Sequence, residues 1–156
     1  MSMDANKPIP QLVAKSATQT VNNSAAFVAD TALTLTVKKA TRYRFKLHYI
    51  FTVVNTSGVK VDLNGGTATM TSINGQIYMT DLATWAGIGN EAGGQITALT
   101  SAVGVTACGT LVSVVAEGVF LSNAKGTFVP RFAQNGAAVE NTVAQVNSSL
   151  MLQEIA

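Results

Sequence analysis

The stretch that decides the fold class is TRYRFKLHYIFTV, which spans residues 41–53. Aromatic and aliphatic side chains occupy its odd-numbered positions from Tyr43 to Val53, whereas basic side chains occupy the even-numbered positions from Arg42 to His48. A period of two residues separates such groups onto opposite faces only when the backbone is a β-strand. We therefore expect a strand whose apolar face belongs to the core and whose basic face points away from it.

Similar alternation recurs along the chain. Apolar residues take every second position in runs at 32–37, 59–63, 112–120, 127–133 and 150–155. Roughly eight to ten short strands of this kind, with turn signals at close spacing, are typical of an antiparallel β-sandwich or a jelly roll. The sequence therefore predicts an all-β fold.

Turn residues interrupt the alternating runs. Asn-Gly steps occur at residues 64–65, 74–75 and 135–136. Asn-Gly favours type I′ turns, because both central residues of such a turn need a positive φ, so we predict a tight hairpin at each step. The one helical signal is TDLATWAGIG, residues 80–89, with Thr80 or Asp81 as the N-cap.

The first residues differ from the rest of the chain. Pro8 and Pro10 disrupt regular strand pairing, and the polar stretch MSMDANK has no apolar period. We expect residues 1–18 to form an N-terminal arm, either disordered or laid across a neighbouring subunit, and residues 19–156 to form a single domain. Lys7, Pro8 and Pro10 are then candidate contact residues of the arm.

The composition is unusual in its low charge. Hydrophobic residues make up 47% of the chain but charged residues only 12%, about half of the share in an average soluble domain. No window approaches the roughly 20 apolar residues of a membrane-spanning helix, so a membrane is not the explanation. A surface of neutral polar residues suits a chain that is pressed against other subunits, although such surfaces also occur on monomeric β proteins.

The residues that could carry chemistry are few and isolated. Cys108 is the only cysteine, which excludes an intramolecular disulfide, and its apolar surroundings favour a buried thiol. His48 is the only histidine, and no neighbouring carboxylate in the sequence orients it. DLNGG at 62–66 lacks most ligands of a calcium loop, and NEAGG at 90–94 lacks the lysine of a phosphate loop. We expect no catalytic, cofactor-binding or metal-binding residues and no enzymatic activity.

Arg42, Arg44 and Lys46 form the basic face of the central strand, and they are candidate interaction residues. Nucleic acid is not the expected partner, because the aromatic side chains that would stack on bases lie on the opposite face. Pairing with acids of adjacent strands and contact with another subunit both remain open. Trp85 is a further candidate, either as a plug over one end of the barrel or as an interface anchor.

The C-terminal third adds a recurrent spacing of residue types. A stretch of the form G-x-F-x-P-x-F-A-Q begins at Gly126, Thr-Val follows at 142–143, and small residues precede a last apolar strand from Leu150. With RYRFKLHYIFTV and VSVVAEGVFL, this pattern resembles small structural proteins of tailed bacteriophages, which are jelly rolls related to tumour-necrosis-factor and complement-globular-head modules. Asn147 stands where glycine is more usual, and Asn tolerates the same left-handed backbone.

The resemblance covers residues 24–156, and it implies a jelly-roll domain that assembles as a homotrimer. It further implies a capsid decoration, or cement, protein that is made in the host cytoplasm and binds the major capsid protein on the outer surface of the virion. An alternative that the same resemblance allows is a fibre or tail-tip domain that binds a host receptor.

Overall fold

The computed structural model describes residues 8–54, 56–82, 92–105 and 110–155. These residues form antiparallel strands and one short 3-10 helix, η1 (Thr31–Leu33), which confirms the prediction of an all-β chain. The strands are β1 (Gln11–Ala14), β2 (Gln19–Asn22), β3 (Val28–Ala29), β4 (Leu35–Val37), β5 (Arg42–Thr52), β6 (Val59–Asp62), β7 (Met70–Asp81), β8 (Ala92–Ile96), β9 (Val103–Val105), β10 (Leu111–Ser122), β11 (Gly126–Phe128), β12 (Arg131–Ala133), β13 (Asn141–Ala144) and β14 (Ser149–Ile155).

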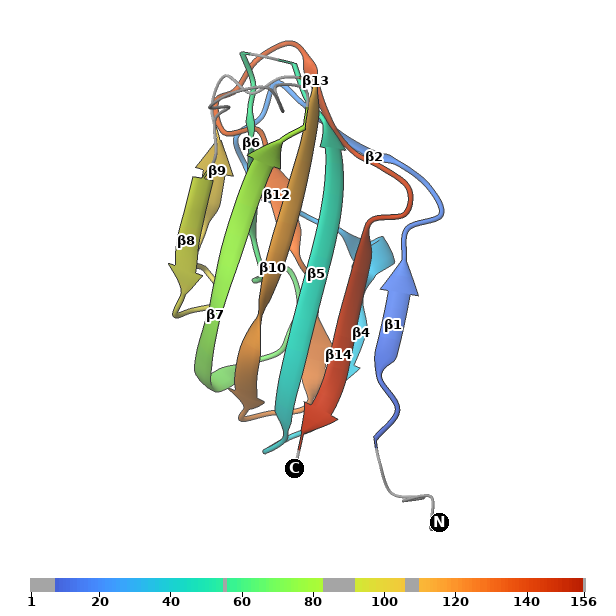
Figure 1. Cartoon of the computed structure of the whole chain (residues 1–156), viewed down its shortest axis with the longest axis vertical. Helices are drawn as coiled ribbons and strands as arrows, with labels where there is room; N and C mark the ends of the chain where they lie inside the picture. The colour runs from blue at the N-terminus through green and yellow to red at the C-terminus, as the bar shows by residue number, and fades with distance from the viewer. Residues whose placement is uncertain (1–7, 55, 83–91, 106–109, 156) are drawn as a thin grey trace.

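The strands form two layers, as an antiparallel β-sandwich does (Figure 1). The larger layer is an eight-stranded sheet with the order β1-β14-β5-β10-β7-β8, in which β13 pairs with both β5 and β2. The second layer contains the four-stranded sheet β3-β12-β6-β9 and the two-stranded sheet β11-β4. Every ladder between these strands is antiparallel.

Strand β5 confirms the alternation read from the sequence. Its core face is fully buried and consists of Tyr43, Phe45, Leu47, Tyr49 and Phe51. The rings meet aromatic residues of the second layer, with centroid distances of 5.7 Å from Phe45 to Phe128 and 5.2 Å from Phe51 to Phe132. Burial of one such side chain contributes about 1.5–3 kcal/mol, so this strand provides a large share of the contact between the layers.

The predicted hairpin at Asn74-Gly75 is wrong, because both residues lie inside the long strand β7. Gly75 is instead the cross-strand partner of Gly118 in β10, and the ring of Phe45 lies against both. A Cβ added to Gly118 would come within 2.6 Å of the Cα of Gly75 and 2.9 Å of the ring of Phe45. Glycine is therefore needed here for close packing rather than for a turn.

The other two Asn-Gly steps do not form tight hairpins either. The step at residues 64–65 follows β6 and leads toward β7, and the step at 135–136 lies between β12 and β13. In both places the two strands belong to different sheets, so the turn connects the layers instead of joining neighbours in one ladder. At these two places Asn-Gly marks a change of direction, but it does not reveal which strands pair.

Two further expectations concern single positions. Asn147 has a φ of 66°, the left-handed conformation expected for the residue in the place of a glycine. The helix predicted at residues 80–89 does not begin where expected, because its proposed N-cap residues Thr80 and Asp81 belong to β7. Residues 83–89 of that segment, with Trp85, lie outside the described residues, as does Cys108.

The segment expected to form an arm, residues 1–18, is partly integrated into the sandwich. Gln11–Ala14 forms β1, which pairs with β14 at one edge of the large sheet. Residues 8–10 precede it in an exposed, non-strand conformation. β1 therefore belongs to the large sheet, although it lies within the segment expected to form an arm.

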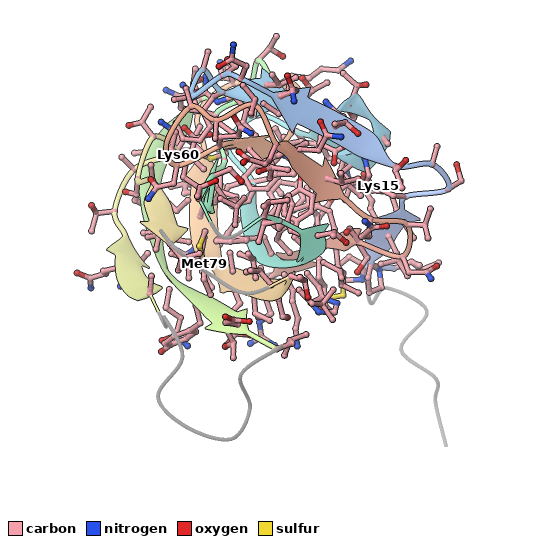
Figure 2. All side chains as sticks on the ribbon, turned by 90° about the horizontal axis from the view of Figure 1, so that it is seen from above. Lys15, Lys60 and Met79 are labelled. Carbon is pink, nitrogen blue, oxygen red and sulfur yellow. The ribbon has the colours of Figure 1, made fainter. Side chains whose placement is uncertain are left out.

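A buried ion pair holds this N-terminal strand to the core. The Nζ of Lys15, which follows β1, donates to both carboxylate oxygens of Asp30 at 2.8 Å, and the hydroxyl of Tyr49 donates to the same carboxylate at 3.1 Å. Lys15 is only 3% exposed and Asp30 is fully buried (Figure 2 labels Lys15). Burial, reinforced by the Asp30 charge, raises the pKa of Tyr49 well above its usual value. The network thus joins β1, the start of η1 and β5.

We predict that Asp30→Ala lowers the free energy of unfolding by about 3–5 kcal/mol, because it leaves the Lys15 ammonium buried without a counter-charge. The double variant K15M/D30A should be more stable than D30A alone, since the uncompensated charge is gone. Urea unfolding of the single and double variants measures this coupling. Lys39→Ala, at an exposed turn, is the control and should change stability by no more than about 0.5 kcal/mol. Strictly additive effects would contradict the network.

A second prediction concerns alkaline pH. The pKa of Tyr49 in the folded chain lies above its value when unfolded, so its contribution to stability is complete below about pH 10 and is lost as the pH rises toward the folded value. Between about pH 9 and pH 11, wild-type protein should therefore lose more unfolding free energy than Tyr49→Phe does. If the unfolding free energies of the two proteins instead fall in parallel over this range, the pKa of Tyr49 does not differ between the folded and unfolded states, and the prediction is wrong.

Candidate functional site

The basic residues predicted from the sequence lie together on the outer face of β5. Arg42, Arg44 and Lys46, here called the basic column, are exposed and follow one another at alternate positions. Their cross-strand partners in β10 are Leu121, Val119 and Glu117, and their partners in β14 are Ile155, Gln153 and Met151. The column is therefore bordered by mainly uncharged side chains.

Among the described residues, the basic column forms no ion pairs with acids of the adjacent strands. The ion pairs among the described residues are Lys15–Asp30, Lys38–Glu154 and Arg131–Asp62. Glu117 lies opposite Lys46 in the ladder, but its carboxylate accepts a hydrogen bond from Nε2 of Gln76 at 3.3 Å. Within the part of the chain that is described, the charges of the column remain available to a partner.

The outer face of the large sheet is hollowed beside the basic column. This outer groove has a volume of about 870 Å³ and lies over β5, β10, β7 and β8, which stand side by side in Figure 1. The register places four polar side chains in one row across these strands: Lys46, Glu117, Gln76 and Gln95. Arg44 and Asn74 lie on one side of the row, and Tyr78 lies on the other.

A chain of hydrogen bonds orders the middle of the outer groove. The hydroxyl of Tyr78 donates to Oε1 of Gln76 at 2.7 Å, and Gln76 in turn donates to Glu117. Both polar atoms of the Gln76 amide, Oε1 and Nε2, thus have a hydrogen-bond partner. Tyr78 is 50% exposed, and its ring lies against Gly93, its cross-strand neighbour in β8, where an added Cβ would be 3.4 Å from the ring.

His48 lies on the same outer face, one step along β5 from Lys46. Its Nε2 lies 3.3 Å from the hydroxyl oxygen of Ser113 in β10. No hydrogen bond joins His48 to a carboxylate in the described part of the chain, whereas a catalytic serine and histidine are normally completed by an orienting acid. The described residues also contain no cluster of three or more histidine, cysteine or acidic side chains that could hold a metal ion.

A different polar cluster lies on the outside of the second layer. Arg131 in β12 donates from Nε and Nη2 to the carboxylate of Asp62 in β6, at 2.8 and 2.5 Å, and this hydrogen bonding raises the pKa of Arg131. The ring of Phe27 lies 4.9 Å from the guanidinium of Arg131 and 5.0 Å from Nζ of Lys60, which Figure 2 labels. Asp62, the first residue of the DLNGG stretch, therefore has a structural role.

The exposed apolar residues lie partly at the N-terminal edge, defined here as Pro8, Ile9, Pro10 and Leu12. Ile9 is 89% exposed and Leu12 is 70% exposed, and Pro8 and Pro10 are exposed beside them. The two prolines are recognisable in the sequence as contact candidates, whereas Ile9 and Leu12 are not, because a four-residue strand gives too short an apolar period. Lys7, also predicted, lies outside the described residues.

The chain matches no protein-family model, no curated protein and no solved structure. None of the described residues belongs to a helix with the length and hydrophobicity needed to cross a membrane.

We predict that the basic column contributes little to folding, in contrast to Arg131. Lys46→Gln should change the free energy of unfolding by no more than about 0.5 kcal/mol, since Lys46 is exposed and has no ion-pair partner among the described residues. Arg131→Gln should cost about 2 kcal/mol, because it removes two hydrogen bonds from the buried carboxylate of Asp62. Urea unfolding of the matched pair tests this, and an equal loss in both variants would assign Lys46 a structural role.

Proposed function

We propose that this chain is a structural protein of a bacteriophage virion, a decoration or cement protein that binds as a homotrimer over junctions between capsid subunits. The observation that supports this proposal best is the N-terminal edge, where Ile9 and Leu12 are largely exposed next to the edge strand β1. Apolar residues gathered at a sheet edge lose contact with water when a second subunit covers them. The edge thus fits assembly better than it fits an isolated protomer.

The prolines of the N-terminal edge fit the same role. Pro8 and Pro10 cannot donate backbone hydrogen bonds, so the segment they restrict does not extend β1 into uncontrolled strand pairing. Their fixed φ angles also reduce the entropy that is lost when the segment settles on a neighbour. In this proposal the sandwich is of jelly-roll type, and the residues before β1 form a short arm that reaches an adjacent subunit.

Decoration by a trimer works through area and valency. A protein that contacts several capsid subunits at once binds through many modest interfaces, and the separation of those subunits must break all of them together. The low share of charged residues, 12%, suits a surface of which much is covered in the assembled virion. The resemblance of the C-terminal third to phage structural proteins is the second support for this role.

The alternative is a fibre or tail-tip domain of the same fold that binds a host receptor. The outer groove favours this alternative, because it presents ordered polar side chains and an exposed ring on a rigid sheet. The two roles use different surfaces, the N-terminal edge for assembly and the outer groove for a ligand. Labelling the chain in purified virions distinguishes them, since a decoration protein covers the head and a receptor-binding domain lies on the tail.

We predict that the purified chain has a mass of about 49 kDa in solution, three times the 16.2 kDa of one copy. The double variant I9D/L12D should lower this mass toward that of one copy, because charge at the N-terminal edge opposes its burial. Val139→Asp is the matched control, since Val139 is 77% exposed elsewhere on the molecule. Size-exclusion chromatography with light scattering measures all three proteins, and a wild-type monomer would refute the trimer.

Deletion of residues 1–10 tests the arm directly, because it removes Pro8, Ile9 and Pro10 but keeps β1 and the Lys15–Asp30 pair. The truncated protein should stay folded and bind capsid shells at least tenfold more weakly than the full chain in a co-sedimentation assay. Undiminished binding to shells would exclude a role for the arm.

A further inference from the structure

The outer groove has the dimensions of a site for a short linear polymer. Its polar row runs across four adjacent strands, from Lys46 in β5 to Gln95 in β8. Three steps between neighbouring strands, at about 4.8 Å each, give the row a length of about 14 Å. A row of this length can contact several successive units of such a polymer. Each side chain of the row stands on a hydrogen-bonded strand, so the spacing is fixed by the sheet.

The side chains of the outer groove combine the two kinds of contact that a sugar offers. A sugar ring has an apolar face of C–H groups, which packs on an exposed aromatic ring, and a rim of hydroxyls, which pairs with planar polar groups. Tyr78 provides the ring, while Gln76, Gln95 and Glu117 provide amides and a carboxylate within the same groove. Val119 and Met151 add apolar surface to its lining.

The hydrogen bonds in the outer groove prepare it for a ligand. Tyr78 and Glu117 hold Gln76 from two sides, so this central side chain loses little freedom when a ligand binds. Gln76 uses one amide oxygen lone pair and one amide hydrogen in these bonds and keeps one of each for a ligand. A ligand hydroxyl, which both donates and accepts, matches those remaining groups.

The charge of the outer groove indicates which sugars fit. Arg44 and Lys46 contribute two cations against the single carboxylate of Glu117, and neither cation forms an ion pair within the described residues. An anionic group on the ligand would therefore meet unpaired positive charge at the β5 side of the groove. The geometry points to an oligosaccharide that carries carboxylates, and we propose that the outer groove binds such an acidic oligosaccharide.

A nucleic acid is a poorer match for the same site. Single-stranded binding sites stack successive bases on several aromatic side chains, whereas Tyr78 is the one exposed aromatic side chain among the lining residues. The inference goes beyond the assembly role and does not depend on it, because the N-terminal edge and the outer groove share no residue.

The experiment is a calorimetric titration of the full chain with tetragalacturonate, sialyllactose and cellotetraose. The first probe represents acidic polysaccharides and the second the acidic ends of cell-surface glycans, so the stronger binder identifies the source. Cellotetraose is neutral and should bind at least tenfold more weakly than the better acidic probe. Tetraglutamate and a thymidine oligonucleotide test whether charge alone explains binding.

Variants of the outer groove make the test specific. Tyr78→Ala should weaken binding of the acidic probe about tenfold, whereas Tyr78→Phe, which keeps the ring, should retain more of the affinity. Lys46→Ala should weaken it to a similar extent, and Lys39→Ala, at an exposed lysine outside the groove, should not. Each variant should keep the solution mass of wild-type protein, while I9D/L12D should keep the affinity for the sugar.

Several results would overturn the proposal. The proposal is wrong if neither acidic sugar binds, or if cellotetraose binds as tightly as the better acidic sugar. It is also wrong if tetraglutamate or the oligonucleotide binds as tightly as that sugar or more tightly. Finally, Tyr78→Ala must not leave the affinity for the acidic sugar unchanged. Loss of the trimer in a groove variant would place the groove in the assembly interface and would also contradict the proposal. The two proposals therefore fail through different measurements.

Discussion

The separation of two kinds of side chain along β5 is the constraint on which the rest of this protein depends. Its odd-numbered residues enter the core, where Phe45 and Phe51 pack against aromatic rings of the second layer. The same alternation directs Arg44 and Lys46 outward, into the outer groove. A shift of one residue would exchange the two faces and lose both features together. Core packing therefore also fixes where the charges of the candidate site stand.

Much of this architecture could be predicted from local pattern, because a two-residue period in β5 has one structural explanation. Signals that depend on tertiary context misled the prediction. Asn74-Gly75 has the composition of a hairpin turn, yet its glycine serves the packing of Phe45 on Gly118, a residue more than 40 positions away. Residues near Pro10 appeared too irregular for a strand, but the buried pair formed by Lys15 anchors β1 to the sheet.

The candidate site was predictable only in part. The basic column is visible in the sequence as a row within one strand, but its neighbours come from β10, β7 and β8, and their register cannot be read from composition. Gln76 and Tyr78 are unremarkable polar residues in the sequence, and they matter only because the ladder places Gln76 beside Glu117. Exposed apolar residues such as Ile9 likewise have no meaning until the edge beside them is known.

The position of the buried Lys15–Asp30 pair has a mechanical consequence. Gln11 lies opposite Leu152, so tension applied between the start of β1 and the end of β14 pulls from one end of an antiparallel ladder and separates its hydrogen bonds one after another. Such peeling needs little force until it reaches Lys15, where an ammonium must leave a buried carboxylate. β1 thus separates from β14 gradually under tension as far as Lys15. The buried ion pair then resists further separation and protects the two layers from being pulled apart.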